Sequence, residues 1–370
     1  MNRTLLIIIC VAAWALSCAQ NPAMPGARPF RMGFTPWPYE FTAVAVERTY
    51  SFIAAHGDII SHHLDNGVPW DEMLTNGAFP APVEKEIADR LSRKRSGQKI
   101  FLSLNPLELD RRNLAGYWNT ATQMPLAGLW KSRSFSDSNV ITAYINYCRK
   151  MIDRFQPDYM AYTIEANVGF SNTNDALFTN YLVLASNVYT TLKSAYPALP
   201  VMLTIVAADF NDGFEELKPL DEKLLQFSDF VAVSTYPYFD PDNAPQIADT
   251  ARIKSGWLKE IAALAPAKPF AIAETGFIAE TYDSLGLMIP ANSKWQADYI
   301  NLLYRELTDL NAVFAVWFVP QDYDKGSKQL ASMGIPAYDY WRDTGLLDGT
   351  GTARPSLTVW DEWYRLPKSR

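Results

Sequence analysis

The chain has 370 residues, of which 48% are hydrophobic and 20% are charged, as in a globular protein with ample apolar material for a large core. Its formal net charge of −7 argues against nucleic acid as a partner, because proteins that bind nucleic acid present a basic surface.

The amino terminus has the features of a bacterial export signal. A positively charged start is followed by an apolar run over residues 5–15, which is too short to span a membrane. The tetrapeptide Ala15-Leu16-Ser17-Cys18 then resembles the lipobox of bacterial lipoproteins, in which the cysteine becomes the lipidated first residue of the mature protein. An ordinary signal peptide that happens to contain Cys18 is the alternative.

The lipobox sets the expected domain boundaries and location. We predict a signal peptide over residues 1–17, a lipid-anchored tether over residues 18–29 and one folded domain over residues 30–370. Ala19 is not the aspartate that keeps lipoproteins at the inner membrane under the enterobacterial sorting rule. We therefore expect a membrane partner through the lipid on Cys18, at the outer membrane, on its periplasmic or cell-surface face.

The three cysteines leave no disulfide for the mature domain. Cys10 lies in the signal peptide and Cys18 at the predicted anchor, so only Cys148 remains. Cys148 falls on the apolar face of a predicted helix, where it is interpreted as core packing and not as a nucleophile.

Short apolar runs recur along the folded domain and predict eight strands. The runs are continuous rather than alternating, as expected for strands buried on both faces. They are Phe30–Pro36, Asp58–His62, Lys99–Asn105, Tyr159–Glu165, Val201–Val206, Phe230–Tyr236, Pro269–Glu274 and Val313–Phe318.

Helical patterns lie between these strands. Ser293 and Gln296 form a capping box that opens a helix to about Leu307, and a last helix is expected around Thr358–Tyr364. Strand–helix alternation repeated in this way predicts a single α/β domain, a (β/α)8 TIM barrel. An open doubly wound sheet is the alternative, but the sequence after the first strand has no glycine fingerprint for a dinucleotide.

Two loops are unusually long. They cover Pro106–Ser136, after the third strand, and Val319–Pro355, after the eighth. Both leave the carboxyl ends of their strands, so both should cover the face of the barrel on which catalysis takes place. Loops of this length in a compact domain usually have a function.

Two glutamates lie at the ends of predicted strands. Glu165 ends the fourth strand and Glu274 the seventh, each after an apolar run and before turn residues. A carboxylate at such a position costs free energy unless it is used. A pair of carboxylates across the mouth of a barrel is the constellation that cleavage of a glycosidic bond requires, and structural ion pairs are the alternative for each. Glu280 repeats the Ala-Glu-Thr string of Glu274 but lies in loop sequence, so it is the weaker candidate nucleophile.

The sequence offers little for other chemistries. The histidines are His56, His62 and His63, and two adjacent histidines on a strand point to opposite faces, so we expect no catalytic metal and no cofactor. There is no nucleophile elbow for a serine hydrolase and no phosphate loop.

The chain resembles the clan A retaining glycoside hydrolases, which are (β/α)8 barrels with the acid/base glutamate ending the fourth strand and the nucleophile ending the seventh. Glu165 and Glu274 match these positions, and Ala273-Glu274-Thr275-Gly276-Phe277 is similar to the nucleophile segment of several clan members. Ser234-Thr235-Tyr236-Pro237-Tyr238 resembles the sixth-strand end of the family 53 endo-β-1,4-galactanases.

The resemblance assigns roles to further residues. It implies that Tyr236 bonds the nucleophile and that Trp317 forms the floor of the −1 subsite, with Tyr238 as a substrate contact. The clan usually has asparagine before the acid/base, whereas this chain has Ile164, and Asn167 is the residue expected to bond the substrate hydroxyl instead.

Other residues that end or follow strands are candidate substrate contacts. Trp37 and Trp70 are expected as aromatic platforms for sugar rings, with packing under the loops as the alternative. Asn105, Asp65 and His63 are expected to bond hydroxyl groups.

These observations predict a monomeric retaining glycosidase that cleaves a β-linked poly- or oligosaccharide, with a carbohydrate as its substrate. A surface lipoprotein that keeps the barrel and binds glycans without cleaving them is the alternative, and Ile164 is the residue that favours it. A lyase or isomerase would recruit lysine or metal ligands that the strand ends do not offer.

Overall fold

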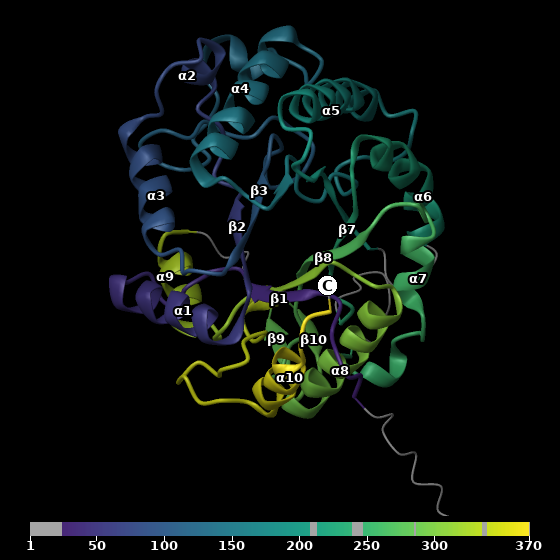
Figure 1. Ribbon diagram of the computed structural model, residues 1–370. Helices are drawn as coiled ribbons and strands as arrows, with labels where there is room; N and C mark the ends of the chain where they lie inside the picture. Colours follow the sequence, from purple (N-terminus) through teal and green to yellow (C-terminus); the bar gives the residue numbers. More distant parts are fainter. Residues whose placement is uncertain (1–23, 208–212, 239–246, 285, 335–338, 370) are drawn as a thin grey trace, which may run out of the picture.

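The structure is a computed structural model that describes residues 24–207, 213–238, 247–284, 286–334 and 339–369 (Figure 1). The predicted signal peptide, the anchor Cys18 and most of the predicted tether lie outside these residues. Among the described residues, no helix is both long and apolar enough to cross a membrane.

The strands form a closed parallel barrel. The sheet order is β5-β4-β3-β2-β1-β11-β8-β7-β6, and every pair of neighbours in it is parallel. The terminal strands β5 and β6 are halves of the single predicted strand Val201–Val206, interrupted at Leu203, so the sheet closes on itself. The strands are β1 (Arg31–Phe34), β2 (Ile59–Leu64), β3 (Lys99–Leu104), β4 (Tyr159–Ala161), β5 (Val201–Met202), β6 (Thr204–Val206), β7 (Val231–Thr235), β8 (Phe270–Thr275) and β11 (Phe314–Trp317).

All eight predicted strands are therefore present, in a (β/α)8 barrel. The predicted fourth strand is shortened, because β4 ends at Ala161 and the segment to Glu165 forms an irregular turn. A small antiparallel hairpin, β9 (Tyr282–Ser284) with β10 (Leu287–Ile289), follows β8.

Helices surround the strands (Figure 1). They are α1 (Ala43–His56), α2 (Trp70–Leu74), α3 (Ala81–Ser92), α4 (Ser138–Phe155), α5 (Ala176–Ala195), α6 (Gly213–Leu224), α7 (Trp257–Ala262), α8 (Ser293–Asp309), α9 (Asp324–Ser332) and α10 (Pro355–Arg365), with short 3-10 turns at Gly128–Ser132, Leu225–Phe227, Thr250–Arg252 and Asp339–Trp341.

Helix α8 begins at Ser293, its predicted N-cap, so the observed N-cap lies one residue earlier. The N-cap is Asn292, whose side chain accepts a hydrogen bond from the amide of Trp295, and Ser293 is already helical. Gln296 is buried and donates to the carbonyl of Phe277, so it does not form the expected capping box. Asn292 is as good a cap as serine, and the tertiary contacts of Gln296 decide between them.

The core has two parts, separated by the strands. A small apolar cluster fills the inside of the barrel and includes Phe101, Phe230 and Phe314. A much larger cluster lies between the strands and the helices and contains the buried Cys148 on α4. Because the inside of the barrel is packed, a site for a ligand can form only where the strands end.

Candidate active site

Strand phase decides which side chains reach the mouth of the barrel. In β2, Ile59 belongs to the inner cluster and Ile60 to the outer one. Since side chains alternate along a strand, His63 and Asp65 point inward near the mouth and His62 points outward. His62 is indeed fully buried against Phe155 of α4, on the helix side of the sheet.

A β-bulge directs Glu274 into the mouth. Ala271 and Ala273 of β8 belong to the inner cluster, so plain alternation would turn Glu274 outward toward the helices. The register of β8 shifts at this point against both of its neighbours, β7 and β11. The extra residue resets the alternation, so that Glu274 faces inward and Thr275 faces outward, where it bonds Tyr299 of α8.

Glu274 is held by two neighbours. The hydroxyl of Tyr236 donates to its Oε1 over 2.6 Å, and Nδ1 of His63 lies 3.2 Å from its Oε2. Burial opposes the charged carboxylate, but the charge of His63 and the hydrogen bonds of His63 and Tyr236 outweigh it, so the pKa of Glu274 is lowered. Burial would likewise lower the pKa of His63, but the charge of Glu274 outweighs it and raises that pKa. Glu274 is therefore an ionised, oriented carboxylate.

Glu165 sits on the turn after β4 with a strained backbone. Its φ of 53° lies in the left-handed region, which costs a residue with a side chain about 1–3 kcal/mol. The side chain of Thr204 fixes this turn by accepting a hydrogen bond from the amide of Glu165 over 2.8 Å. The carboxylate of Glu165 accepts a hydrogen bond from the guanidinium of Arg111 over 3.0 Å. Arg111 also pairs with Asp65 over 2.6 Å.

The two glutamates share a set of neighbours. Burial raises the pKa of Tyr236, and the charges of Glu274 and of Glu165 raise it further. Both carboxylates also raise the pKa of His63. Arg111, which bonds Glu165, contributes to the lowered pKa of Glu274. The mouth therefore brings together two carboxylates: Glu274, which is ionised and hydrogen-bonded, and Glu165, which lies on a strained turn. Acid/base and nucleophilic chemistry needs two such groups.

Two of the residues predicted to be aromatic platforms are buried, so these predictions are wrong. Trp317 is only 1% exposed and packs outward against Tyr299 and Trp360, while its ring nitrogen donates to the carbonyl of Thr344. Trp70 is fully buried at the start of α2, where its ring nitrogen donates to the carbonyl of Ala115. Neither ring can contact a sugar in this arrangement.

Three expected polar contacts are also buried. Asn167 spans the turn after Glu165, bonding Asp221 and both the amide and the carbonyl of Val206. Tyr238 is 2% exposed and donates to the carbonyl of Tyr340. Asn105 donates to Asp65 and accepts from the amide of Ile164. Asn167 therefore does not replace the asparagine that the clan has before the acid/base. All three side chains are engaged in buried hydrogen bonds with the protein itself.

The remaining predicted residues lie at the mouth. His63 and Asp65 are half-buried there, on Glu274 and on Arg111 respectively. Trp37 is half-buried and its ring contacts Phe41, Phe318 and Tyr323. Glu280 is exposed and pairs with Arg354, so it is not a nucleophile in this structure.

Two residues of the site escaped the sequence analysis. Phe318, half-buried, contacts Trp37 and Tyr236 and therefore occupies the aromatic position expected of Trp317. Strand phase was the available signal, since Phe314 and Val316 face inward and Phe318 continues that series. Arg111 lies in the long loop after β3, where no periodic pattern marks a residue as part of a site.

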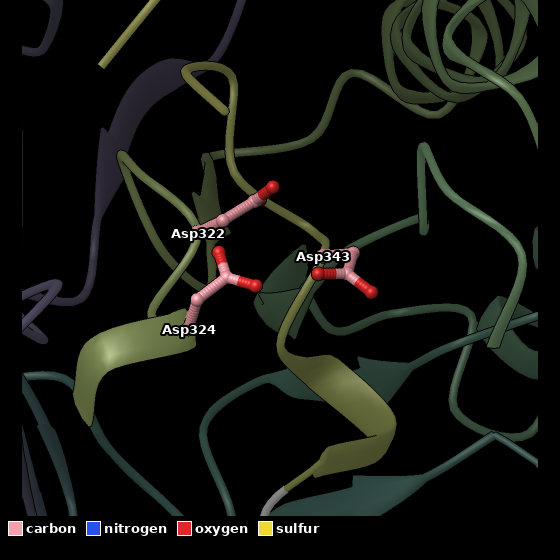
Figure 2. Close-up of side chains that lie close together, drawn as sticks. All are labelled: Asp322, Asp324 and Asp343. Atoms are coloured by element: carbon pink, nitrogen blue, oxygen red, sulfur yellow. The ribbon is translucent and has the colours of Figure 1, made fainter. Parts of the chain in front are cut away.

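One acidic cluster in the loop after β11 resembles a metal site. Asp322, Asp324 and Asp343 each place a carboxylate oxygen within 4.8 Å of the others (Figure 2). Two arginines balance them: Arg354 pairs with Asp322 over 2.8 Å, and Arg342 pairs with Asp343 over 2.8 Å and with Asp324 over 3.6 Å. We interpret the cluster as an ion-pair network that fixes the conformation of this loop.

Comparison with known proteins identifies the fold. The sequence matches no protein-family model and no curated protein. Its structure is similar to an exo-β-1,4-mannosidase from Opitutaceae bacterium strain TAV5, with a TM-score of 0.64 at 13% identity over 92% of this chain and 60% of that one. It is also similar to GH5_18 from Streptomyces cattleya in complex with GlcNAc, with a TM-score of 0.63 at 15% identity over 93% of this chain and 83% of that one.

A third match is the GH53 catalytic domain of Ignisphaera aggregans, with a TM-score of 0.58 at 17% identity over 94% of this chain and 98% of that one. The chain spans less than two thirds of the mannosidase but nearly the whole of this domain. At these identities the likeness concerns the fold alone: the chain has a (β/α)8 barrel, as these glycoside hydrolases do.

Proposed function

We propose that this protein is a retaining glycoside hydrolase that cleaves a β-linked poly- or oligosaccharide. The observation that carries the proposal is the setting of Glu274, a carboxylate turned into the barrel mouth by a bulge and bonded by Tyr236 and His63. An ionised carboxylate in that place suits a nucleophile, and Glu165 supplies a second carboxyl group at the same mouth.

The proposed reaction has two steps. Glu274 attacks the anomeric carbon while protonated Glu165 gives its proton to the leaving oxygen, which breaks the glycosidic bond and forms a glycosyl ester of Glu274. Glu165, now a carboxylate, then takes a proton from water, whose oxygen attacks the anomeric carbon and releases Glu274. Tyr236 and His63 hold Glu274 in place, and Phe318 and Trp37 present aromatic surface to the sugar.

The experiment compares three alanine variants. Glu165→Ala should reduce turnover of substrates with poor leaving groups by roughly 10²- to 10⁴-fold and spare activated aryl glycosides, since only the former need a proton from the enzyme. Glu274→Ala should be inactive on both. Glu280→Ala is the matched control, because it has the same Ala-Glu-Thr sequence context but is exposed. An active Glu274→Ala variant would refute the nucleophile, and equal losses in Glu165→Ala would refute the acid.

The second candidate is a barrel that binds glycans without cleaving them. Ile164 in place of the clan's asparagine favours it. Release of reducing ends from a panel of β-linked polysaccharides separates the two functions. Binding to a polysaccharide with no release of reducing ends would support the binding protein.

We also propose that the protein is exported as an outer-membrane lipoprotein and acts as a monomer there. The support is the lipobox that ends at Cys18. Incorporation of labelled palmitate into the wild type but not into Cys18→Ala would support the anchor, and equal labelling of both would refute it.

A further inference from the structure

The long loop after β3 carries Arg111, whose guanidinium bonds Glu165 and Asp65. Arg111 lies within Pro106–Ser136, and its side chain is only 9% exposed. One terminal nitrogen of its guanidinium donates to Glu165 over 3.0 Å and the other to Asp65 over 2.6 Å. Such a fork fixes the direction of both carboxylates, because the guanidinium is planar and its donors are rigid.

Glu165 needs such a partner more than Glu274 does. Strand β4 ends at Ala161, four residues before Glu165, whereas Glu274 lies within β8. Glu274 has hydrogen bonds from two side chains, whereas the carboxylate of Glu165 accepts its side-chain hydrogen bond from Arg111 among the residues that the structure describes. The direction of the Glu165 carboxylate therefore depends on the loop and not on the barrel.

The contacts of Arg111 form a closed circuit. Asp65, which holds Arg111, accepts a hydrogen bond from Asn105 over 3.0 Å. The oxygen of the same Asn105 side chain accepts from the amide of Ile164 over 3.4 Å. The contacts thus run from the carboxylate of Glu165 through Arg111, Asp65 and Asn105 to the backbone amide of Ile164. They restrain the side chain of Glu165 and the backbone next to it.

The backbone of the loop is bent to bring Arg111 to this place. Arg111 has a φ of 60° and Glu165 has a φ of 53°, so both partners of the ion pair adopt the left-handed conformation. Strain of this kind persists only where surrounding contacts over-determine the conformation, and it concentrates at functional sites.

We propose that Arg111 is a positioning residue that orients Glu165 for both of its proton transfers. The inference rests on the proposed function, because it assigns a task to Glu165 as acid and base. Other charged and titratable groups around Glu165 are Asp65, His63, Tyr236 and Glu274. Of these, Asp65 is held by Arg111 itself, and the other three belong to the network of the nucleophile.

The test is the kinetics of Arg111→Met with two classes of substrate. For an unactivated β-linked oligosaccharide, kcat/KM should fall by about 100-fold, the loss expected when a catalytic group is displaced by an ångström. For an activated aryl glycoside, kcat/KM should be nearly unchanged, while kcat and KM fall together. That split arises because bond cleavage no longer needs an acid, whereas release of the glycosyl-enzyme still needs a base and becomes rate-limiting.

Two further variants make the result specific. Arg111→Lys keeps one charge but loses the fork, so it should recover only part of the loss on the oligosaccharide. Arg112→Met is the matched control, since the neighbouring Arg112 contacts the carbonyl of Gly169 and Asp175 and neither glutamate. It should retain the activity of the wild type on both substrates.

The outcomes separate the inference from the function. A wild type without activity on any substrate overturns the proposed function and the inference with it. A wild type that is active, with Glu165→Ala discriminating between the substrates but Arg111→Met losing both equally or neither, overturns the inference alone. Equal losses in Arg111→Met and Arg112→Met would also overturn it, because they would reflect damage to the loop.

Discussion

At the scale of single residues, the site depends on a histidine paired with the proposed nucleophile. His63 and Glu274 shift each other's pKa in opposite directions, upward for the histidine and downward for the carboxyl group, although burial opposes both shifts. Each therefore stays charged over a wider range of pH than it would alone. The pair keeps Glu274 ionised in mildly acidic solution.

This pairing predicts a change in the pH profile of His63→Ala. Without the imidazolium, burial dominates and the pKa of Glu274 rises, so the acidic limb of kcat/KM should move to higher pH. The profile is best measured with an activated aryl glycoside, for which protonation of the leaving group does not limit the rate. His56→Ala is the control, because His56 pairs with Asp361 at the outside of the barrel. An acidic limb that stays in place in His63→Ala would show that His63 does not tune Glu274.

Sequence reasoning predicted the polar residues at the barrel mouth better than the aromatic residues around them. The rule that polar residues at strand ends gather at one mouth selected Glu165, Glu274 and His63, and the family resemblance selected Tyr236. The resemblance failed at Trp317, because adjacent residues at a strand end face opposite sides and only the phase of the strand distinguishes them. The bulge that turns Glu274 inward is a property of the register between strands, which no single segment of sequence records.

At the scale of elements, the backbone of the turn after β4, which carries the proposed acid/base, closely approaches the backbone of the loop after β3. A Cβ atom added to Gly169, four residues after Glu165, would lie 1.9 Å from the carbonyl oxygen of Arg111. Only glycine lets the turn after β4 and the loop after β3 approach so closely. The turn that carries Glu165 and the loop that carries Arg111 are therefore packed backbone to backbone at Gly169.

Gly169→Ala should accordingly affect both stability and activity. The clash is between two backbones, so one of them must shift, at a cost of about 1–3 kcal/mol in the free energy of unfolding. Activity on unactivated substrates should fall more than activity on aryl glycosides, because the shift displaces Arg111 from Glu165. Urea unfolding and the kinetics of both substrates measure these effects. Gly26→Ala, with open space around the added atom, is the matched control, and equal behaviour of the two variants would contradict the prediction.

The elements themselves were predictable because their sequence patterns are local. All eight strands follow from continuous apolar runs, and their boundaries differ by a few residues. The exception is the fourth strand, where the left-handed turn at Glu165 depends on contacts with Thr204 and Arg111 that come from other parts of the chain. Loop conformation was not predictable for the same reason.

At the scale of the whole molecule, Asp221 is a carboxyl group that is buried away from the barrel mouth. It lies on α6 and is 3% exposed, and its Oδ1 accepts a hydrogen bond from Asn167 over 2.9 Å. Burial raises the pKa of Asp221 to about 8, although the hydrogen bond from Asn167 opposes the shift. This group links the turn behind Glu165 to the outer layer and makes the stability of the fold depend on pH.

The sign of that dependence follows from the two pKa values. Between the ordinary value of 3.8 and about 8, native Asp221 holds a proton that the unfolded chain has lost. Its contribution to stability is therefore complete below the lower value and is lost as the pH rises through the upper one, by at most about 1.4 kcal/mol per pH unit.

Asp221→Asn retains an oxygen for Asn167 and cannot ionise. The free energy of unfolding of the variant relative to the wild type should therefore increase from about pH 5 to about pH 8, as measured by urea unfolding at several pH values. Glu215→Gln, which alters an exposed carboxylate on the same helix, should show no such trend. A constant difference between Asp221→Asn and the wild type would mean that native Asp221 is already ionised at pH 5, and that the buried contact with Asn167 is made by a carboxylate.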